Sequence, residues 1–208
     1  MAAGKPGPVI PERYAQALGT DDPVDVMAAT PDLLRKIVKG LTEKQLATKP
    51  APGKWSIKEI AAHLADGEVI LGSRYRMVAA HDRPALPGYD QDAFVERLGP
   101  MNTTTTDLID DFSMVRAANL GLLLRLPKDA WERVGLHSER GEESIDFMVH
   151  MYAGHDRIHL SQIETIRTGL FPKKKAKAVK TTAPRKPAPK KGAPKKADAG
   201  KTAARKGR

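Results

Sequence analysis

The sequence predicts an all-α protein: a four-helix bundle with short helical connectors and a disordered C-terminal tail. Four segments of roughly 15–25 residues repeat apolar side chains at the i, i+3, i+4 spacing of an amphipathic helix; they span residues 22–39, 56–80, 103–126 and 144–168. No segment shows a convincing alternation of polar and apolar residues, as a half-buried strand would. Four amphipathic helices of this length are the parts of a four-helix bundle.

The first two helices have clear start signals. Asp22 precedes Pro23, so an N-cap acceptor is followed by proline at the first helical position. Pro31 lies inside the same helix and lacks a backbone donor, which predicts a kink or a split there. In the second helix, Ser56 and Glu59 have the spacing of a capping box, in which the two side chains accept hydrogen bonds from each other's backbone N–H groups.

The last two helices are bounded in a similar way. Threonines at positions 103–106 offer several N-caps for the third helix, and Pro127 ends it. Ser144 caps the fourth helix, and Gly169 follows its predicted end. The connection at 81–102 has the length of loops that often carry function. Residues 133–143 are predicted to be a polar connection without strands.

The basic character of the chain is confined to its last residues. Residues 173–208 hold 15 of the 35 lysines and arginines but only one of the 25 acidic residues, so residues 1–172 carry 20 basic and 24 acidic residues. The composition predicts a flexible lead-in over residues 1–21, the bundle over 22–172, and a disordered tail rich in Lys, Ala and Pro over 173–208. The tail suits nucleic acid, although a merely solubilising tail is the alternative.

Other chemistries and locations are limited by what the sequence lacks. The 208 residues include no cysteine, which excludes disulfides, thiolate zinc sites and a cysteine nucleophile. No apolar run approaches the length of a membrane span, and the N-terminus has no signal-peptide pattern. We therefore expect a cytoplasmic protein, with nucleoid association if the tail binds DNA.

Two histidines in the fourth helix predict a metal site. His155 and His159 are four residues apart, so they lie about 40° from one another on the apolar face of the helix. Buried imidazoles need partners for their ring nitrogens, and two on one face are a common arrangement for binding a metal. His63, at the flank of the apolar face of the second helix, is the candidate third ligand. Three neutral imidazoles leave a coordination position open for a water or a thiol.

The polar residues near the histidine pair have both structural and functional interpretations. A single histidine near a core is usually structural, which is the alternative for His63 alone. Gln162 lies on the face of the histidine pair and is a candidate for orienting a ligand or contacting substrate. His150, in contrast, is predicted to lie off this face, and Asp156 is predicted to point away from the pair. The connector histidines are predicted to be solvated; they are His81 and His137.

Three stretches together resemble the DinB-like (DinB/YfiT) superfamily. They are residues 54–66 (KWSIKEIAAHLAD), 83–90 (RPALPGYD) and 155–163 (HDRIHLSQI). The resemblance implies an up-down-down-up bundle with a divalent metal, zinc or nickel, on His63, His155 and His159. It also suggests that Tyr89 and Asp90 border the pocket. Relatives in this family include S-transferases and isomerases that use a low-molecular-weight thiol.

Three hypotheses follow for function. The first is a metal-dependent enzyme that activates a small thiol or a water for transfer, isomerisation or hydrolysis. The second is a non-enzymatic, stress-related binding module that associates with nucleic acid through residues 173–208. The third is a purely structural metal in a bundle that serves as a homodimerisation unit.

Overall fold

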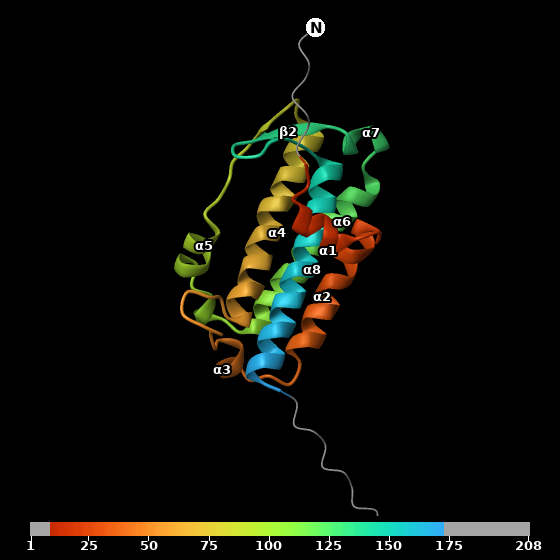
Figure 1. Ribbon diagram of the computed structural model, residues 1–208. Coiled ribbons are helices and arrows are strands. Elements are labelled where there is room, and N and C mark those ends of the chain that lie inside the picture. Colours follow the sequence, from red (N-terminus) through yellow and green to blue (C-terminus); the bar gives the residue numbers. More distant parts are fainter. Residues whose placement is uncertain (1–8, 173–208) are drawn as a thin grey trace, which may run out of the picture. The chain divides into compact units, whose positions relative to one another are not determined.

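A computed structural model of the chain describes residues 9–172, and these form the predicted four-helix bundle (Figure 1). The long helices are α2 (Pro23–Val38), α4 (Ile57–Ala80), α6 (Thr105–Arg125) and α8 (Ile145–Leu170). Helices α2 and α8 run in one direction and α4 and α6 in the other, which confirms the up-down-down-up order (Figure 1). The predicted basic tail, residues 173–208, lies outside the described residues.

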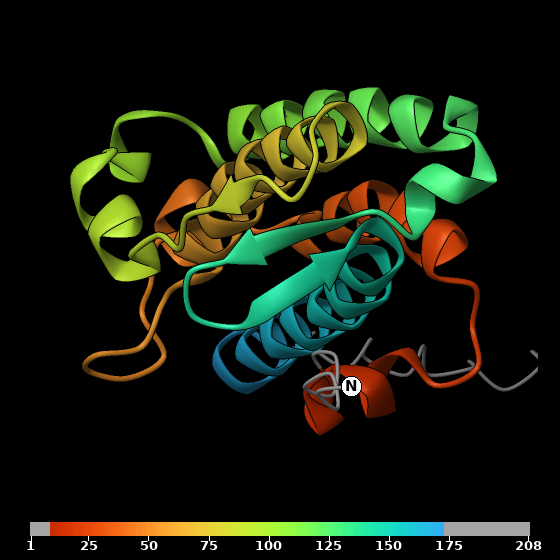
Figure 2. The ribbon, with the colours of Figure 1, turned by 90° about the horizontal axis from the view of Figure 1, so that it is seen from above.

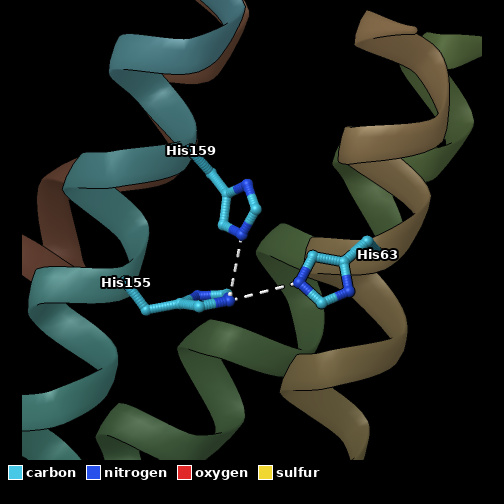
Figure 3. A group of neighbouring side chains, drawn as sticks. All are labelled: His63, His155 and His159. Atoms are coloured by element: carbon cyan, nitrogen blue, oxygen red, sulfur yellow. Dashed lines mark hydrogen bonds between the residues drawn. The ribbon is translucent and has the colours of Figure 1, made fainter. Parts of the chain in front are cut away.

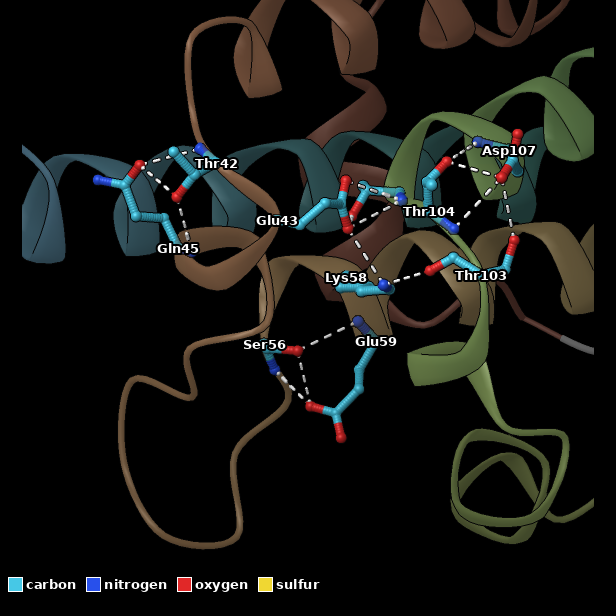
Figure 4. Close-up of polar contacts among 10 residues, drawn as sticks. Thr42, Glu43, Gln45, Ser56, Lys58, Glu59, Thr103, Thr104 and Asp107 are labelled. Carbon is cyan, nitrogen blue, oxygen red and sulfur yellow. Dashed lines mark hydrogen bonds and ion pairs between the residues drawn. The ribbon is translucent and has the colours of Figure 1, made fainter.

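The predicted helix caps are present. The Ser56 Oγ accepts from the backbone N of Glu59 at 3.2 Å, and the Glu59 Oε2 accepts from the backbone N of Ser56 at 2.7 Å, which is the capping box (Figure 4). Asp22 caps α2, and Ser144 caps α8. Helix α8 continues to Leu170, slightly beyond its predicted end. These local signals explain why the helix starts could be predicted closely.

Helix α2 is continuous through Pro31, so the helix is not split there. A proline removes the hydrogen bond to the carbonyl four residues earlier, here that of Met27. In the structure the Met27 carbonyl accepts instead from Nη1 of Arg116, at 2.8 Å. A buried side chain from α6 thus replaces the missing helical bond, and α2 passes through the proline without a break.

Part of the predicted flexible lead-in is a helix. Helix α1 (Glu12–Leu18) packs against α8. The contact depends on Gly154, because a Cβ there would lie 2.2 Å from the Tyr14 carbonyl oxygen. The lead-in expected over residues 1–21 thus includes the helix α1, which ends just before Gly19.

A small sheet lies across one end of the bundle (Figure 2). Strand β1 (Ala85–Leu86) pairs in parallel with β2 (Val134–His137), which forms an antiparallel hairpin with β3 (Gly141–Ser144). The prediction that residues 133–143 form a strand-free connection is wrong. The strands are too short to show a polar–apolar alternation, and β1 pairs with a partner about 50 residues away.

The remaining elements are short. They are α3 (Glu43–Leu46), α5 (Gln91–Arg97), the 3-10 turn η1 (Pro100–Asn102) and α7 (Lys128–Trp131). Glu43 of α3 accepts hydrogen bonds from the backbone N and the hydroxyl of Thr105 and from Lys58 Nζ, which joins three helices (Figure 4). Within residues 9–172, no helix is long and apolar enough to cross a membrane.

The core consists of two apolar clusters. A buried polar layer lies between them, made by Glu68, Arg116, Asn119 and Asp156. The Arg116 guanidinium donates to Asp156 Oδ2 at 2.6 Å and to Glu68 Oε2 at 2.8 Å. Asn119 donates to Glu68 Oε1 at 2.8 Å. Glu68 lies five residues after His63 on α4, and Asp156 directly follows His155 on α8. Through Arg116 the polar layer therefore links the two helices that carry the histidines.

Candidate metal centre

Helices α4 and α8 bring His63, His155 and His159 together (Figure 3). The Nε2 atom of His155 lies 3.2 Å from Nε2 of His63 and 3.1 Å from Nε2 of His159. Figure 3 shows the three rings converging from the two helices. In the described part of the chain, this is the group of three His, Asp or Glu side chains that is close enough to share a cation.

Burial keeps two of these imidazoles neutral at ordinary pH. Desolvation, followed by the other two histidines, lowers the pKa of His63 to about 2. Desolvation, followed by His155, lowers the pKa of His159 to about 4. A neutral imidazole has a ring nitrogen with a free lone pair, which is the form that binds a metal.

The spacing of the three nitrogens fits a bound cation. One ring nitrogen carries either a proton or a single lone pair, so Nε2 of His155 cannot form two good hydrogen bonds to its two neighbours. Ligand bonds of 2.0–2.1 Å in a tetrahedral zinc site place neighbouring nitrogens about 3.3 Å apart. The observed separations of 3.1 and 3.2 Å are close to this value. The donor set therefore fits a divalent metal.

Gln162 and Asp156 lie near the Nδ1 atoms of His159 and His155, away from the Nε2 atoms that converge. Nδ1 of His159 donates to Oε1 of Gln162 at 3.0 Å, which leaves the lone pair of His159 on Nε2, the atom facing the other rings. Nδ1 of His155 is buried without a hydrogen bond, and the nearest carboxylate oxygen, Oδ1 of Asp156, is 4.0 Å away. Asp156 was predicted to point away from the pair. Its carboxylate in fact lies beside His155 while bonded to Arg116.

A cavity of about 190 Å³ opens beside the histidines. His63 and His155 are among the residues that line it, together with Tyr14 of α1 and Tyr89. Asp90, which was predicted with Tyr89 to border the pocket, instead caps α5 through a bond to the backbone N of Ala93. Tyr89 therefore lines the cavity, whereas Asp90 is not among its lining residues.

Several lining residues were missed by the sequence analysis. Arg74 comes from α4, and the hairpin contributes His137, Glu139 and Arg140. His137 was predicted to be solvated, but it is buried within β2. The position of Arg74, eleven residues after His63 and so on the same face of α4, was the available signal. The hairpin residues gave none, because the strand pairing brings them to the site.

The site also lies within the part of the chain that resembles known proteins. Residues 27–163 match the DinB superfamily. Two relatives, from Bacillus cereus and Bacillus thuringiensis subsp. konkukian, carry the name "Putative metal-dependent hydrolase". Each is 26% identical over 145 residues, which cover 67% of this chain and 80% of the relative.

A solved structure shares the fold. It is YfiT from Bacillus subtilis, described as "a probable metal-dependent hydrolase with an unusual four-helix bundle topology". The TM-score is 0.67 at 20% identity, and the match covers 80% of this chain and 93% of YfiT. The family match and the shared fold agree with the expectation drawn from the sequence motifs.

Proposed function

The chain belongs to the DinB superfamily, and from this premise we propose that it is a metal-dependent hydrolase whose divalent metal is held by His63, His155 and His159. The observation that carries the proposal is the convergence of three Nε2 atoms that cannot satisfy one another. The relatives named as metal-dependent hydrolases support the same reaction class. Three imidazoles suit zinc or nickel, and we propose one of these as the metal.

A divalent cation with an open position polarises a carbonyl group and lowers the pKa of a water or thiol near it. The protein's own groups prepare this chemistry. Gln162 fixes the tautomer of His159, so that its lone pair faces the site. Glu139 is the carboxylate among the residues that line the cavity. If a water held by the metal were the nucleophile, Glu139 would be the carboxylate of the cavity lining that takes up its proton.

Metal analysis of the purified full-length protein tests the ligand assignment. We expect about one zinc or nickel per chain, and loss of this metal in the double variant His155→Ala/His159→Ala. The matched control is His150→Ala, because His150 is on the same helix and bonds only the Asp146 carbonyl and lies near its carboxylate. A double variant that retains the full metal content would disprove the assignment.

Hydrolysis is tested separately with a panel of chromogenic esters and amides. We expect turnover by the metal-loaded protein, loss on chelation and recovery when metal is added back. Glu139→Gln should lower the turnover while leaving the metal content unchanged. If a fully loaded protein hydrolyses none of the panel but transfers a small thiol to an electrophile, the hydrolase assignment gives way to the thiol-dependent transferase or isomerase reaction that the sequence resemblance suggested.

The partner predictions are proposed on sequence grounds alone. Nucleic-acid association through residues 173–208 concerns residues outside the described part of the chain. Salt elution from immobilised DNA, compared between the full chain and a chain ending at Phe171, measures it. Light scattering measures the proposed homodimer.

A further inference from the structure

Arg74 is a buried cation without an acidic partner among the described residues. Its side chain is at the cavity wall, and the residue is only 3% exposed. Nη1 donates to the Tyr152 hydroxyl at 3.0 Å and Nη2 to the Pro87 carbonyl at 2.7 Å. Nε has no hydrogen-bond partner. Both partners are neutral, so they orient the guanidinium but leave its charge uncompensated, which is costly in a buried position.

His137 presents a second unpartnered donor to the same cavity. The residue is 4% exposed and lines the cavity. Its Nδ1 accepts from the backbone N of Glu139 at 3.1 Å, so the neutral ring carries its proton on Nε2. Nε2 is buried and has no hydrogen-bond partner within the described residues. Burial, followed by the positive charge of Arg140, lowers the pKa of His137, which favours this neutral donor form.

The charged residues that line the cavity also favour an anion. Three arginines and one glutamate line it, a net charge of +2 with neutral histidines, whereas residues 1–172 as a whole carry more acids than bases. Arg140 is paired with Glu143, and Arg13 lies over the Tyr14 ring and is exposed. Glu139 is exposed. Arg74 is thus the buried lining cation that lacks a compensating charge among the described residues.

We propose that Arg74 and His137 form an oxyanion-binding subsite, and that the substrate of this protein carries a carboxylate or phosphate group that binds there. The proposal rests on the metal-dependent function proposed above. A guanidinium presents planar N–H donors that match these anions, and the His137 N–H adds a neutral donor. A water could accept one of these hydrogen bonds but would not neutralise Arg74. An anion does both, and it would hold the rest of the substrate in the cavity that His63 and His155 line.

Anion binding to the full-length, chelator-treated protein tests the proposal independently of the metal. Circular dichroism first establishes that this protein remains folded. Inorganic phosphate and acetate are titrated separately while the imidazole NMR signals are recorded; the His137 signal is identified by its loss in His137→Asn. This residue-specific signal separates binding in the cavity from binding to the basic tail.

The variants are chosen in matched pairs. Arg74→Gln removes the charge, whereas Arg76→Gln changes an exposed arginine on the same helix that bonds Gly72 and Asn119 outside the cavity. His137→Asn keeps an acceptor near the Nδ1 position and removes the Nε2 donor, whereas His137→Gln keeps a donor near the Nε2 position. Binding to the His137 variants is followed through the signals of the other cavity histidines. If Arg74→Gln does not fold, the His137 pair still tests the proposal.

We expect a saturable shift with at least one anion. The anion that saturates, phosphate or acetate, identifies the group. Affinity should fall about tenfold or more in Arg74→Gln and in His137→Asn, as expected when a charge-assisted or buried hydrogen bond is lost, and should be retained in Arg76→Gln and His137→Gln. The proposed subsite would be disproved if neither anion bound saturably, or if Arg74→Gln bound the anion as tightly as the parent protein. Either result leaves the metal content, and hence the proposed function, unaffected.

Discussion

Replacing Arg116 by Met would unpair two buried carboxylates at once. Its guanidinium donates to Asp156 and Glu68, whose side chains are both 1% exposed, and to the Met27 carbonyl. Removing one partner of a buried ion pair costs about 3–5 kcal/mol, because the remaining charge stays desolvated. The Met27 carbonyl, already without its helical donor, adds about 1 kcal/mol. We therefore expect Arg116→Met to lower the free energy of unfolding by at least 3 kcal/mol.

Urea denaturation at pH 7 measures this loss, provided that the slope against urea stays constant. Arg35→Met is the matched control, since its pair with Asp110 is about half exposed and should cost less than about 1 kcal/mol. Adding Glu68→Gln and Asp156→Asn to Arg116→Met should recover part of the loss, because neutral side chains replace the unpaired charges. A loss for Arg116→Met no larger than that of the control would refute the reasoning.

Three further predictions concern other contacts. Gln162→Ala should weaken metal binding about 10–100-fold in chelator competition, because His159 loses the partner that orients it. Gly154→Ala should lower the free energy of unfolding by about 1–3 kcal/mol, because the new Cβ meets the Tyr14 carbonyl. Burial alone would raise the pKa of Glu43, but the lysine and threonine donors that it contacts lower it below its ordinary value. Glu43 thus stabilises the folded state above pH 4.5, and this contribution is lost as the pH falls below that value. Its side chain is 46% exposed, so solvent screening should limit the cost of Glu43→Gln to less than about 1 kcal/mol at pH 7.

Each of these predictions has a control in the same chain. Gln162→Glu keeps an acceptor and should retain the metal. Gly169→Ala, also in α8, meets no atom within 4 Å and should be neutral or stabilising. Glu96→Gln removes an exposed acid and should not change the pH dependence. Equal metal affinity in both Gln162 variants, equal effects of the two glycine variants, or a pH-independent loss for Glu43→Gln would contradict the corresponding argument.

Features encoded over one or two helical turns could be predicted from the sequence. The capping box at Ser56 and Glu59 depends on three-residue spacing, and the shared face of His155 and His159 on four-residue spacing. His63 could be proposed as their partner because an apolar face must turn toward the other helices. The fold prediction is confirmed, and the three predicted ligands lie together in the structure.

Features that depend on distant pairing could not be predicted in this way. Arg116 contacts Met27, Glu68 and Asp156, each of which is at least 40 residues away along the chain. The pattern around Pro31 contains no sign that a side chain from another helix would satisfy the freed carbonyl. His137 is followed by the polar residues 138–140, as in a surface loop, and its burial follows from the pairing of β2 with two other strands.

The small sheet also separates two tasks between two parts of the molecule. The three histidines project from long helices that pack in the core. Two connections supply five other residues of the cavity lining, which are Gly88, Tyr89, His137, Glu139 and Arg140. Strand pairing and the bond from the Gly88 backbone N to the Ser138 hydroxyl hold these connections together. Exchanging the hairpin residues would therefore change which molecules the cavity admits while the histidine positions stay as they are. The helices thus hold the histidines in place, and the connections at the end of the bundle determine which substrate fits.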